Sequence, residues 1–187
     1  EGHEVHLASR HPLREHQFDS DPGWLGVKYA SSFCRTDDFD ERRSLITSAR
    51  NRGSVPPDMG RALRRAIARK QLHWHEDEVS EVIEDDEKLE VSLKTGSEIA
   101  VDALYLATGF TPGRPGGSMI DELIESASLP CAQCGYPIVD PALRWHPRLY
   151  VTGPLAELAL GPVSRNIAGA RRAGDRIVEA IQGTIQP

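Results

Sequence analysis

The stretch from Asp102 to Pro115 constrains this chain more than any other. It opens as an apolar run, residues 103–107, and breaks at Thr108-Gly109 into a loop rich in proline and glycine. A short apolar run that ends at glycine and is bounded by turn residues predicts a buried strand. In open α/β sheets, ligands bind beyond the carboxyl ends of such strands, and glycine lets a backbone approach a cofactor closely. A plain strand and loop is the alternative that the spacing leaves open.

A second apolar strand with the same Thr-Gly ending is predicted over Arg148 to Gly153. After a short loop, apolar residues at helical spacing predict a helix over about 164–181. The start of this helix, near Ser164-Arg165-Asn166, offers unpaired N–H groups and the positive end of a dipole to an electron-rich ligand edge. Periodicity does not distinguish such a site from an ordinary buried helix.

Composition limits the class of protein. The chain has 187 residues, 39% of them hydrophobic, which is enough for one full core or for one domain and part of another. The net charge of -6 and the pI near 5.6 do not favour non-specific nucleic-acid binding. No apolar stretch approaches the roughly 20 residues that span a bilayer, and nothing resembles a signal peptide. We expect a cytoplasmic protein with a small-molecule substrate and with no nucleic-acid or membrane partner; an oligomer is left open.

The beginning of the chain predicts a domain that is truncated at its N-terminus. There is no initiator methionine, and Gly2-His3 leads directly into Glu4–Ser9, which predicts a strand. If this is the second strand of a βαβ unit, the first strand, the glycine-rich turn and the first helix precede Glu1.

Arg10 follows this predicted strand directly. In a dinucleotide-binding βαβ unit, the end of the second strand meets the adenosine ribose. An acidic residue there suits a free 2′-hydroxyl, and an arginine suits a 2′-phosphate. Arg10 therefore favours NADPH over NADH, with an ordinary surface-loop arginine as the alternative.

The next segment predicts a long irregular connection over 15–40 and two helices, about 40–52 and 57–70. In the connection, Trp24 and Tyr29 either line a ring-binding pocket or pin the loop to its domain. The second helix carries a basic face, which is either solvated or binds a phosphate or a partner.

From about 72–101 the hydrophobic period changes to two, which predicts a β-meander. His73 and His75 share one face of the first strand in this region. No third ligand at a recognisable spacing accompanies them, so we expect exposed strand histidines and no metal site.

Cys131 and Cys134 form a CxxC pair, which is typical of a redox dithiol or of half a zinc site. A structural zinc needs four ligands, and only Cys34 remains. The neighbouring prolines and glycine predict a loop rather than the helix start that favours a redox role. We therefore expect unreactive thiols here.

Leu106-Ala107-Thr108-Gly109, within the stretch from Asp102 to Pro115, resembles the "ATG" motif of the N-hydroxylating (lysine and ornithine) flavin monooxygenases and of related flavoproteins with two dinucleotide-binding domains. In that family this segment links the NADPH domain back to the FAD domain. A strand ending in glycine, followed by a helix that points at the flavin, closes the chain. Gly153 and residues 164–166 are similar to that closing element, so the resemblance covers most of the chain in order.

The resemblance implies an α/β fold with a Rossmann-like NAD(P)-binding domain over residues 1–109, which includes the β-meander at about 72–101. Residues 110–187 would return to the FAD-binding domain and supply its closing strand and helix. Hydride would pass from NADPH to FAD, and the cofactors would carry the chemistry. The implied positions are Arg10 at the 2′-phosphate, Thr108 and Gly109 at the domain junction, and Gly153 and Asn166 near the flavin.

Phe110 stands where tyrosine or histidine is usual in the N-hydroxylating group. The resemblance therefore leaves open a hydroxylase or a simpler reductase. No Ser-His-Asp triad or paired-carboxylate pattern argues for hydrolysis, and the sequence identifies no catalytic side chain. The alternative is a non-catalytic NADP-binding sensor or interaction module that lacks flavin.

Overall fold

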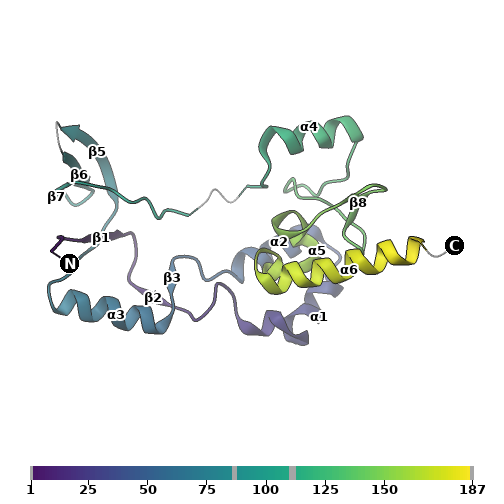
Figure 1. The fold of residues 1–187 in the computed structure, drawn as a ribbon, viewed down its shortest axis with the longest axis horizontal. Coiled ribbons are helices and arrows are strands. Elements are labelled where there is room, and N and C mark those ends of the chain that lie inside the picture. Colours follow the sequence, from purple (N-terminus) through teal and green to yellow (C-terminus); the bar gives the residue numbers. More distant parts are fainter. Residues whose placement is uncertain (1, 86–87, 110–112, 186–187) are drawn as a thin grey trace. The chain divides into compact units, whose positions relative to one another are not determined.

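The chain divides into two compact units in the computed structural model (Figure 1), which describes residues 2–85, 88–109 and 113–185. The first unit comprises Glu1–Gln17 and Gly53–Thr111, and the second comprises Phe18–Arg52 and Pro112–Pro187. The segment 18–52, which the sequence assigned to the NADPH-binding domain, thus packs within the second unit.

The first unit contains two short parallel strand pairs, one helix and a three-stranded antiparallel sheet. Its elements are β1 (His6–Ser9), β2 (Arg14–Glu15), β3 (Ser54–Val55), α3 (Pro57–Ala68), β4 (His73–Glu76), β5 (Val79–Asp85), β6 (Lys88–Leu93) and β7 (Glu98–Val101). Strands β5, β6 and β7 form the β-meander that the alternating pattern predicts. Strand β4 was expected in that meander but pairs in parallel with β1, as β2 does with β3. Parallel pairing joins segments distant in sequence, so local periodicity does not reveal it.

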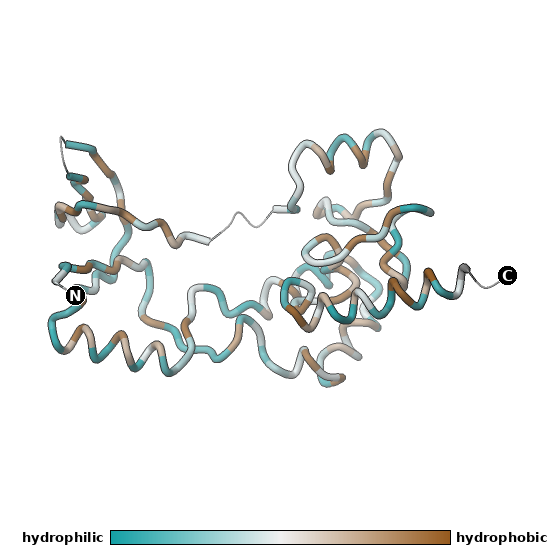
Figure 2. Tube along the Cα trace, in the orientation of Figure 1, coloured by the Kyte–Doolittle hydropathy of each residue, from teal (hydrophilic) through white to brown (hydrophobic). Residues whose placement is uncertain are grey.

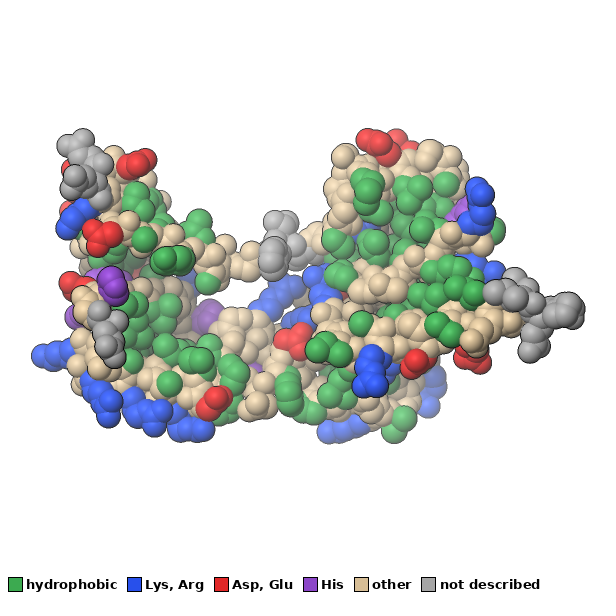
Figure 3. Space-filling model, in the orientation of Figure 1, with side chains coloured by type: hydrophobic (Ala, Val, Ile, Leu, Met, Phe, Trp, Pro, Cys, Tyr) green, Lys and Arg blue, Asp and Glu red, His purple; other side chains and the backbone are tan. Residues whose placement is uncertain are grey.

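Helix α3 shows the basic face that the sequence predicts. It begins at Pro57, where a residue without an N–H suits the first turn. Its basic side chains are exposed along the helix (Figure 3), and Arg64 forms an ion pair with Glu15 of β2. The exposed residues are Arg61, Arg64, Arg65, Arg69 and Lys70.

Three histidines meet across the parallel pair of β1 and β4. The ring of His6 stacks on those of His73 and His75, with centroids 5.0 and 5.3 Å apart. His6 Nδ1 and His75 Nε2 share a hydrogen bond of 3.0 Å. Burial lowers the pKa of His75, and the neighbouring His6 and His73 lower it further. His73 is exposed as predicted, whereas His75 is half-buried. No group of three or more metal-ligating side chains is arranged to hold an ion in the described parts of the chain.

The apolar run 103–107 does not form the strand that the sequence predicts. Residues 103–109 have no regular secondary structure, and Tyr105 and Leu106 are 91% and 77% exposed. The run stands out as apolar along the trace between β7 and residue 109 (Figure 2). A strand needs a neighbouring strand to satisfy its backbone groups, and no described strand pairs with this run.

In its described residues the second unit is mainly helical, with one small antiparallel pair of strands. Its α-helices are α1 (Val27–Arg35), α2 (Phe39–Ser48), α4 (Gly117–Ala127), α5 (Glu157–Leu160) and α6 (Ile167–Ile185). It also contains β8 (Arg144–His146), β9 (Leu149–Tyr150) and three short 3₁₀ turns, η1 (Pro22–Leu25), η2 (Gly153–Ala156) and η3 (Pro162–Arg165). No described helix of either unit is both long and apolar enough to cross a bilayer.

Two predictions of local structure in this unit are wrong. Helix α1 occupies part of the segment expected to be irregular. Tyr29 and Phe33 are four residues apart, the spacing of neighbours on one helix face, but the preceding Gly26 is more typical of a loop. The expected strand from Arg148 to Gly153 is reduced to β9, and the turn η2 begins at Gly153 with φ +59°, a left-handed conformation that suits glycine.

The core of the second unit joins segments from both of its parts. One cluster packs Trp24, Phe33 and Ile46 against Tyr136, Leu158 and Val163. Trp24 and Phe33 meet edge to face, with ring centroids 5.8 Å apart. A second cluster contains Leu143, Trp145, Val151 and Ala173. Trp24 therefore pins its loop to the core, which is the second of the two roles left open for it.

Arginine side chains attach the segment 18–52 to the C-terminal part of this unit. Arg42 Nη1 donates to the carbonyl of Leu158 at 2.9 Å, and Arg50 Nη2 donates to that of Pro162 at 2.7 Å. The C-terminal part also donates to the segment 18–52, because Arg172 Nη1 of α6 donates to the carbonyl of Trp24 at 3.2 Å. Hydrogen bonds from charged donors are stronger than neutral ones, which helps to hold the segment in place.

The histidine cluster predicts an acid-sensitive stability. The pKa of His75 is lowered in the folded chain from its ordinary value of 6.5, so the unfolded state binds more protons as the pH falls below that value. We expect the free energy of unfolding to decrease as the pH falls through about 6.5 toward the lowered pKa, with no further loss from this residue below it. The His75→Gln variant should lose part of this dependence in urea unfolding measured at several pH values.

The exposed His16 provides the matched control, because His16→Gln removes a histidine without touching the cluster. An identical pH dependence in the parent protein and both variants would contradict this account.

Candidate functional site

Arg10 lies in a bend at the carboxyl end of β1 and is exposed. Beside it, Ser9 Oγ donates to the carbonyl of His11 at 2.9 Å and accepts from Trp74 Nε1 at 3.0 Å, which fixes the turn. The positive charge of Arg10 contributes to lowering the pKa of Glu78, after the larger effect of Lys94. The guanidinium therefore stands in an ordered turn and is open to an anionic ligand.

Thr108 and Gly109 are exposed residues near the end of the first unit, which extends to Thr111. Gly109 has φ +76°, and a Cβ built there would meet no atom within 4 Å. Its conformation favours glycine, while the space around it is open. Phe110, which bears on the hydroxylase resemblance, lies outside the described residues.

Gly153 and Asn166 both belong to the second unit. Gly153 begins η2, and Asn166 lies between η3 and α6. Asn166 caps α6, because its Oδ1 accepts from the N–H of Gly169 at 3.0 Å. The helix therefore begins at Ile167, three residues later than the predicted start at Ser164, since η3 occupies residues 162–165.

The backbone packs closely at the start of α6. A Cβ added to Gly169 would lie 2.0 Å from the carbonyl oxygen of Val163, so only glycine allows this approach. Ser164, between them in sequence, is 1% exposed. Its Oγ is buried and has no hydrogen-bond partner among the described residues. A buried hydroxyl without a partner is costly, which makes it a notable feature of this helix start.

A polar cluster lies directly before α6. Glu157 of α5 is 1% exposed. Its carboxylate accepts from Arg43 of α2 and, at 2.8 Å, from Nε of Arg165. The guanidinium of Arg43 lies 4.4 Å from the ring centroid of Tyr136. The Tyr136 hydroxyl accepts from Arg165 at 3.2 Å and donates to the carbonyl of Gly113 at 2.9 Å. We call Glu157, Arg43, Arg165 and Tyr136 the Glu157 cluster.

Arg50 adds a third guanidinium to this region. It is partly buried, which lowers its pKa, while its ion pair with Asp19 opposes that effect. The charges of Arg165 and Arg43 also lower the pKa of Arg50, so the three groups interact. The guanidinium groups of Arg43 and Arg165 pair with Glu157, and that of Arg50 pairs with Asp19.

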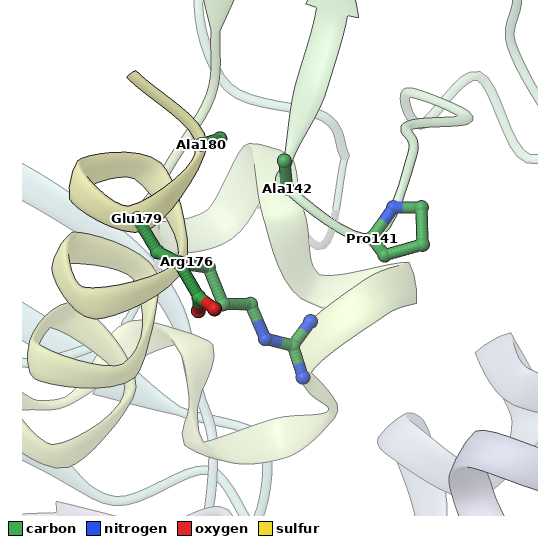
Figure 4. Close-up of a pocket in the computed structure, with 5 residues that line it drawn as sticks. All are labelled: Pro141, Ala142, Arg176, Glu179 and Ala180. Carbon is green, nitrogen blue, oxygen red and sulfur yellow. The ribbon is translucent and has the colours of Figure 1, made fainter. Parts of the chain in front are cut away.

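An open hollow of about 220 Å³ lies elsewhere on α6. Pro141 and Ala142 line one side, and Arg176, Glu179 and Ala180 of α6 line the other (Figure 4). Arg176 and Glu179 project from the same side of the helix. The hollow contains none of the residues predicted from the sequence, and we do not assign it a function.

The predicted site residues are divided between the two units. Gly153 and Asn166 lie in the second unit, whereas Arg10, Thr108 and Gly109 lie in the first. Sequence reasoning missed Glu157, Arg43 and Tyr136. The available signal for Glu157 was its charge inside the apolar run 155–160, because a carboxylate in such a run is buried only when it is paired.

The chain belongs to the pyridine nucleotide-disulphide oxidoreductase family, whose model matches residues 22–182. No curated protein sequence matches it significantly.

A solved structure agrees with this assignment at the level of the fold. Ornithine hydroxylase from Pseudomonas aeruginosa matches with a TM-score of 0.72 at 15% identity, over 98% of this chain and 47% of that one. This chain therefore spans about half the length of that protein. The predicted α/β dinucleotide-binding fold is confirmed, and the predicted resemblance to the N-hydroxylating flavin monooxygenases is confirmed at the level of the fold. Lysine monooxygenase from Nocardia farcinica matches with a TM-score of 0.42 at 18% identity, over 92% of this chain and 43% of that one.

The Glu157 cluster predicts a strong effect on stability. Glu157→Gln leaves two guanidinium groups without their buried counter-charge, and breaking a buried pair in this way costs about 3 to 5 kcal/mol. Urea unfolding of the variant should show this loss. Glu179→Gln removes an exposed carboxylate from α6 and should change the free energy of unfolding by less than about 0.5 kcal/mol. Similar small losses in both variants would contradict the role given to Glu157.

Proposed function

We propose that this chain is part of a flavin-dependent oxidoreductase that takes hydride from NADPH. The family match over residues 22–182 carries the proposal. The fold shared with ornithine hydroxylase adds support for a monooxygenase-like protein. In this proposal the first unit binds NADPH, and the C-terminal part of the second unit completes the FAD site.

Arg10 supports the assignment of NADPH to the first unit. It follows β1, which pairs in parallel with β4, so both carboxyl ends meet at one edge. Ligands of parallel sheets bind at that edge. An exposed guanidinium offers several donors in a planar fork, which suits a phosphate. Arg10 would hold the 2′-phosphate and so select NADPH over NADH.

The start of α6 fits the edge of a flavin. The N–H groups of the first helical turn have no intrahelical acceptors. The side chain of Asn166 accepts from one of these groups, the N–H of Gly169. The helix dipole and the neighbouring guanidinium groups favour an electron-rich group there. The buried Ser164 hydroxyl, which has no partner among the described residues, adds a polar group at the same place.

The other two predicted residues have more general roles in this proposal. Gly153 would let the backbone turn close to the flavin, because its left-handed φ suits glycine. Thr108 and Gly109 would form the junction between the two dinucleotide-binding domains.

The bound cofactors would supply hydride transfer, and the protein would position them and exclude water. Among this chain's residues, the Glu157 cluster would fix the start of α6, and Asn166 would orient its first turn. The substrate, the final electron acceptor and the choice between hydroxylase and reductase are outside this proposal.

The role of Arg10 predicts a change in cofactor preference. Arg10→Ala in the full-length protein should weaken NADPH binding roughly 10- to 150-fold, because a hydrogen bond to a charged group contributes about 1.5 to 3 kcal/mol. NADH binding should change little. Fluorescence titration of the parent protein and the variant gives the dissociation constants of both nucleotides for this comparison.

Arg14→Ala is the matched control, because Arg14 is an exposed arginine four residues away. It should leave the ratio of the two constants unchanged. Equal losses for NADPH and NADH in Arg10→Ala would contradict the assignment.

A further inference from the structure

The turn that carries Arg10 is held by a chain of two hydrogen bonds that begins at Trp74 of β4. Trp74 Nε1 donates to Ser9 Oγ at 3.0 Å, and Ser9 Oγ donates to the carbonyl of His11 at 2.9 Å. An indole N–H can only donate and a carbonyl can only accept, so the direction of the chain is fixed. The Ser9 hydroxyl serves both as acceptor and as donor. Arg10 lies between the two residues that the second bond joins.

The parallel pairing of β1 and β4 brings Trp74 beside Ser9. Trp74 lies opposite Leu7 in the register. Leu7 and Ser9 share one face of β1, because side chains two residues apart point to the same side of a strand. His73 and His75, the neighbours of Trp74 in β4, lie on the other face, where the histidine rings stack. The indole therefore contacts Ser9 on the face opposite the histidine cluster.

A second contact holds the other side of the turn. The ring of His11 lies against the backbone at Gly53, because a Cβ built on Gly53 would be 2.6 Å from His11 Nε2. Gly53 has φ +66°, a left-handed conformation that favours glycine. Ser9 and His11 are half-buried, whereas Arg10 is exposed. The residues on both sides of Arg10 are thus anchored, while its own side chain reaches solvent.

The Arg10 guanidinium is open to an external anion. Among the residues that the structure describes, none forms an ion pair with Arg10. The carboxylate of Glu78 is paired with Lys94, whose Nζ lies 2.6 Å from Glu78 Oε2. Lys94 accounts for most of the lowering of the pKa of Glu78, and Arg10 adds a smaller part. An arginine on a turn that is ordered before binding loses less conformational entropy when an anion binds.

We propose that Trp74 and Ser9 are positioning residues for nucleotide selection, because their hydrogen bonds fix the turn from which Arg10 reaches the 2′-phosphate of NADPH. Both residues act through Arg10, and neither is assigned a contact with the phosphate. A looser turn would add the entropy of its ordering to the cost of binding the 2′-phosphate. NADH lacks that phosphate and would be affected little. The inference rests on the proposed function, which assigns the 2′-phosphate to Arg10.

The test measures the dissociation constants of NADPH and NADH for the full-length protein by isothermal titration calorimetry. Trp74→Phe keeps an aromatic ring but removes the N–H donor, and Ser9→Ala removes the hydroxyl. Each variant should weaken NADPH binding about three- to tenfold, the range expected for the loss of a neutral hydrogen bond, and should change NADH binding little. Ser9→Thr keeps the hydroxyl and should retain most of the preference for NADPH.

A double variant separates this role from a general structural one. In Arg10→Ala, the further change Trp74→Phe should cause no additional loss of NADPH affinity, because the effects of residues that act through one another are not additive. Trp145→Phe is the matched control. Trp145 Nε1 donates to the carbonyl of Pro130 at 2.8 Å within the second unit. This variant loses the same kind of hydrogen bond without touching the turn, and it should keep the parent's ratio of the two constants.

Selective loss of NADPH binding in Arg10→Ala, with parent-like constants in both Trp74→Phe and Ser9→Ala, would overturn the inference and leave the proposed function intact. Equal losses for the two nucleotides in these variants would also overturn it, because they would indicate a structural role only. A parent protein without a preference for NADPH would overturn both the inference and the assignment of Arg10. The readout needs no flavin. A selective loss in a protein that binds no flavin would therefore support the positioning role while removing the proposed flavoenzyme.

Discussion

The burial of one carboxylate, that of Glu157, shapes the second unit. A carboxylate that is 1% exposed is tolerated only when its charge is matched by hydrogen-bonded partners. Arg43 comes from the segment 18–52 and Arg165 from the start of the C-terminal helix, so this match requires both parts of the unit to be present. The aromatic core around Phe33 and the arginine bonds to backbone carbonyls reinforce the same junction. The first turn of α6 and its cap, Asn166, are placed by this arrangement.

Much of the local structure could be predicted from the sequence, because the signals are local. Proline at the first turn and apolar spacing located α3. Alternation located the β-meander and its end, although the meander begins at Val79 and not near residue 72 as predicted. The family resemblance, carried by the Thr108-Gly109 segment and the C-terminal helix, agrees with the family match and with the fold of ornithine hydroxylase.

The remaining features depend on contacts between distant parts of the chain. Two features produce no periodic pattern in the local sequence: the pairing of β1 with β4, and the packing of residues 18–52 within the second unit. Glu157 lies in an apolar run, which indicates a buried carboxylate, but Arg43 is far away in sequence, so the partner could not be identified. The run 103–107 shows the opposite case, because its apolar pattern predicts a strand, while no described strand pairs with it.

The proposal that this chain is part of a flavoprotein reduced by NADPH can be tested on the full-length protein. The most direct measurement is the visible absorption spectrum of the full-length protein, before and after NADPH is added without oxygen. The account predicts the two-band spectrum of a bound flavin, bleached by NADPH and much more slowly by NADH. A colourless protein that cannot be reconstituted with FAD, yet still binds NADPH, would contradict it and would favour the non-catalytic nucleotide-binding module.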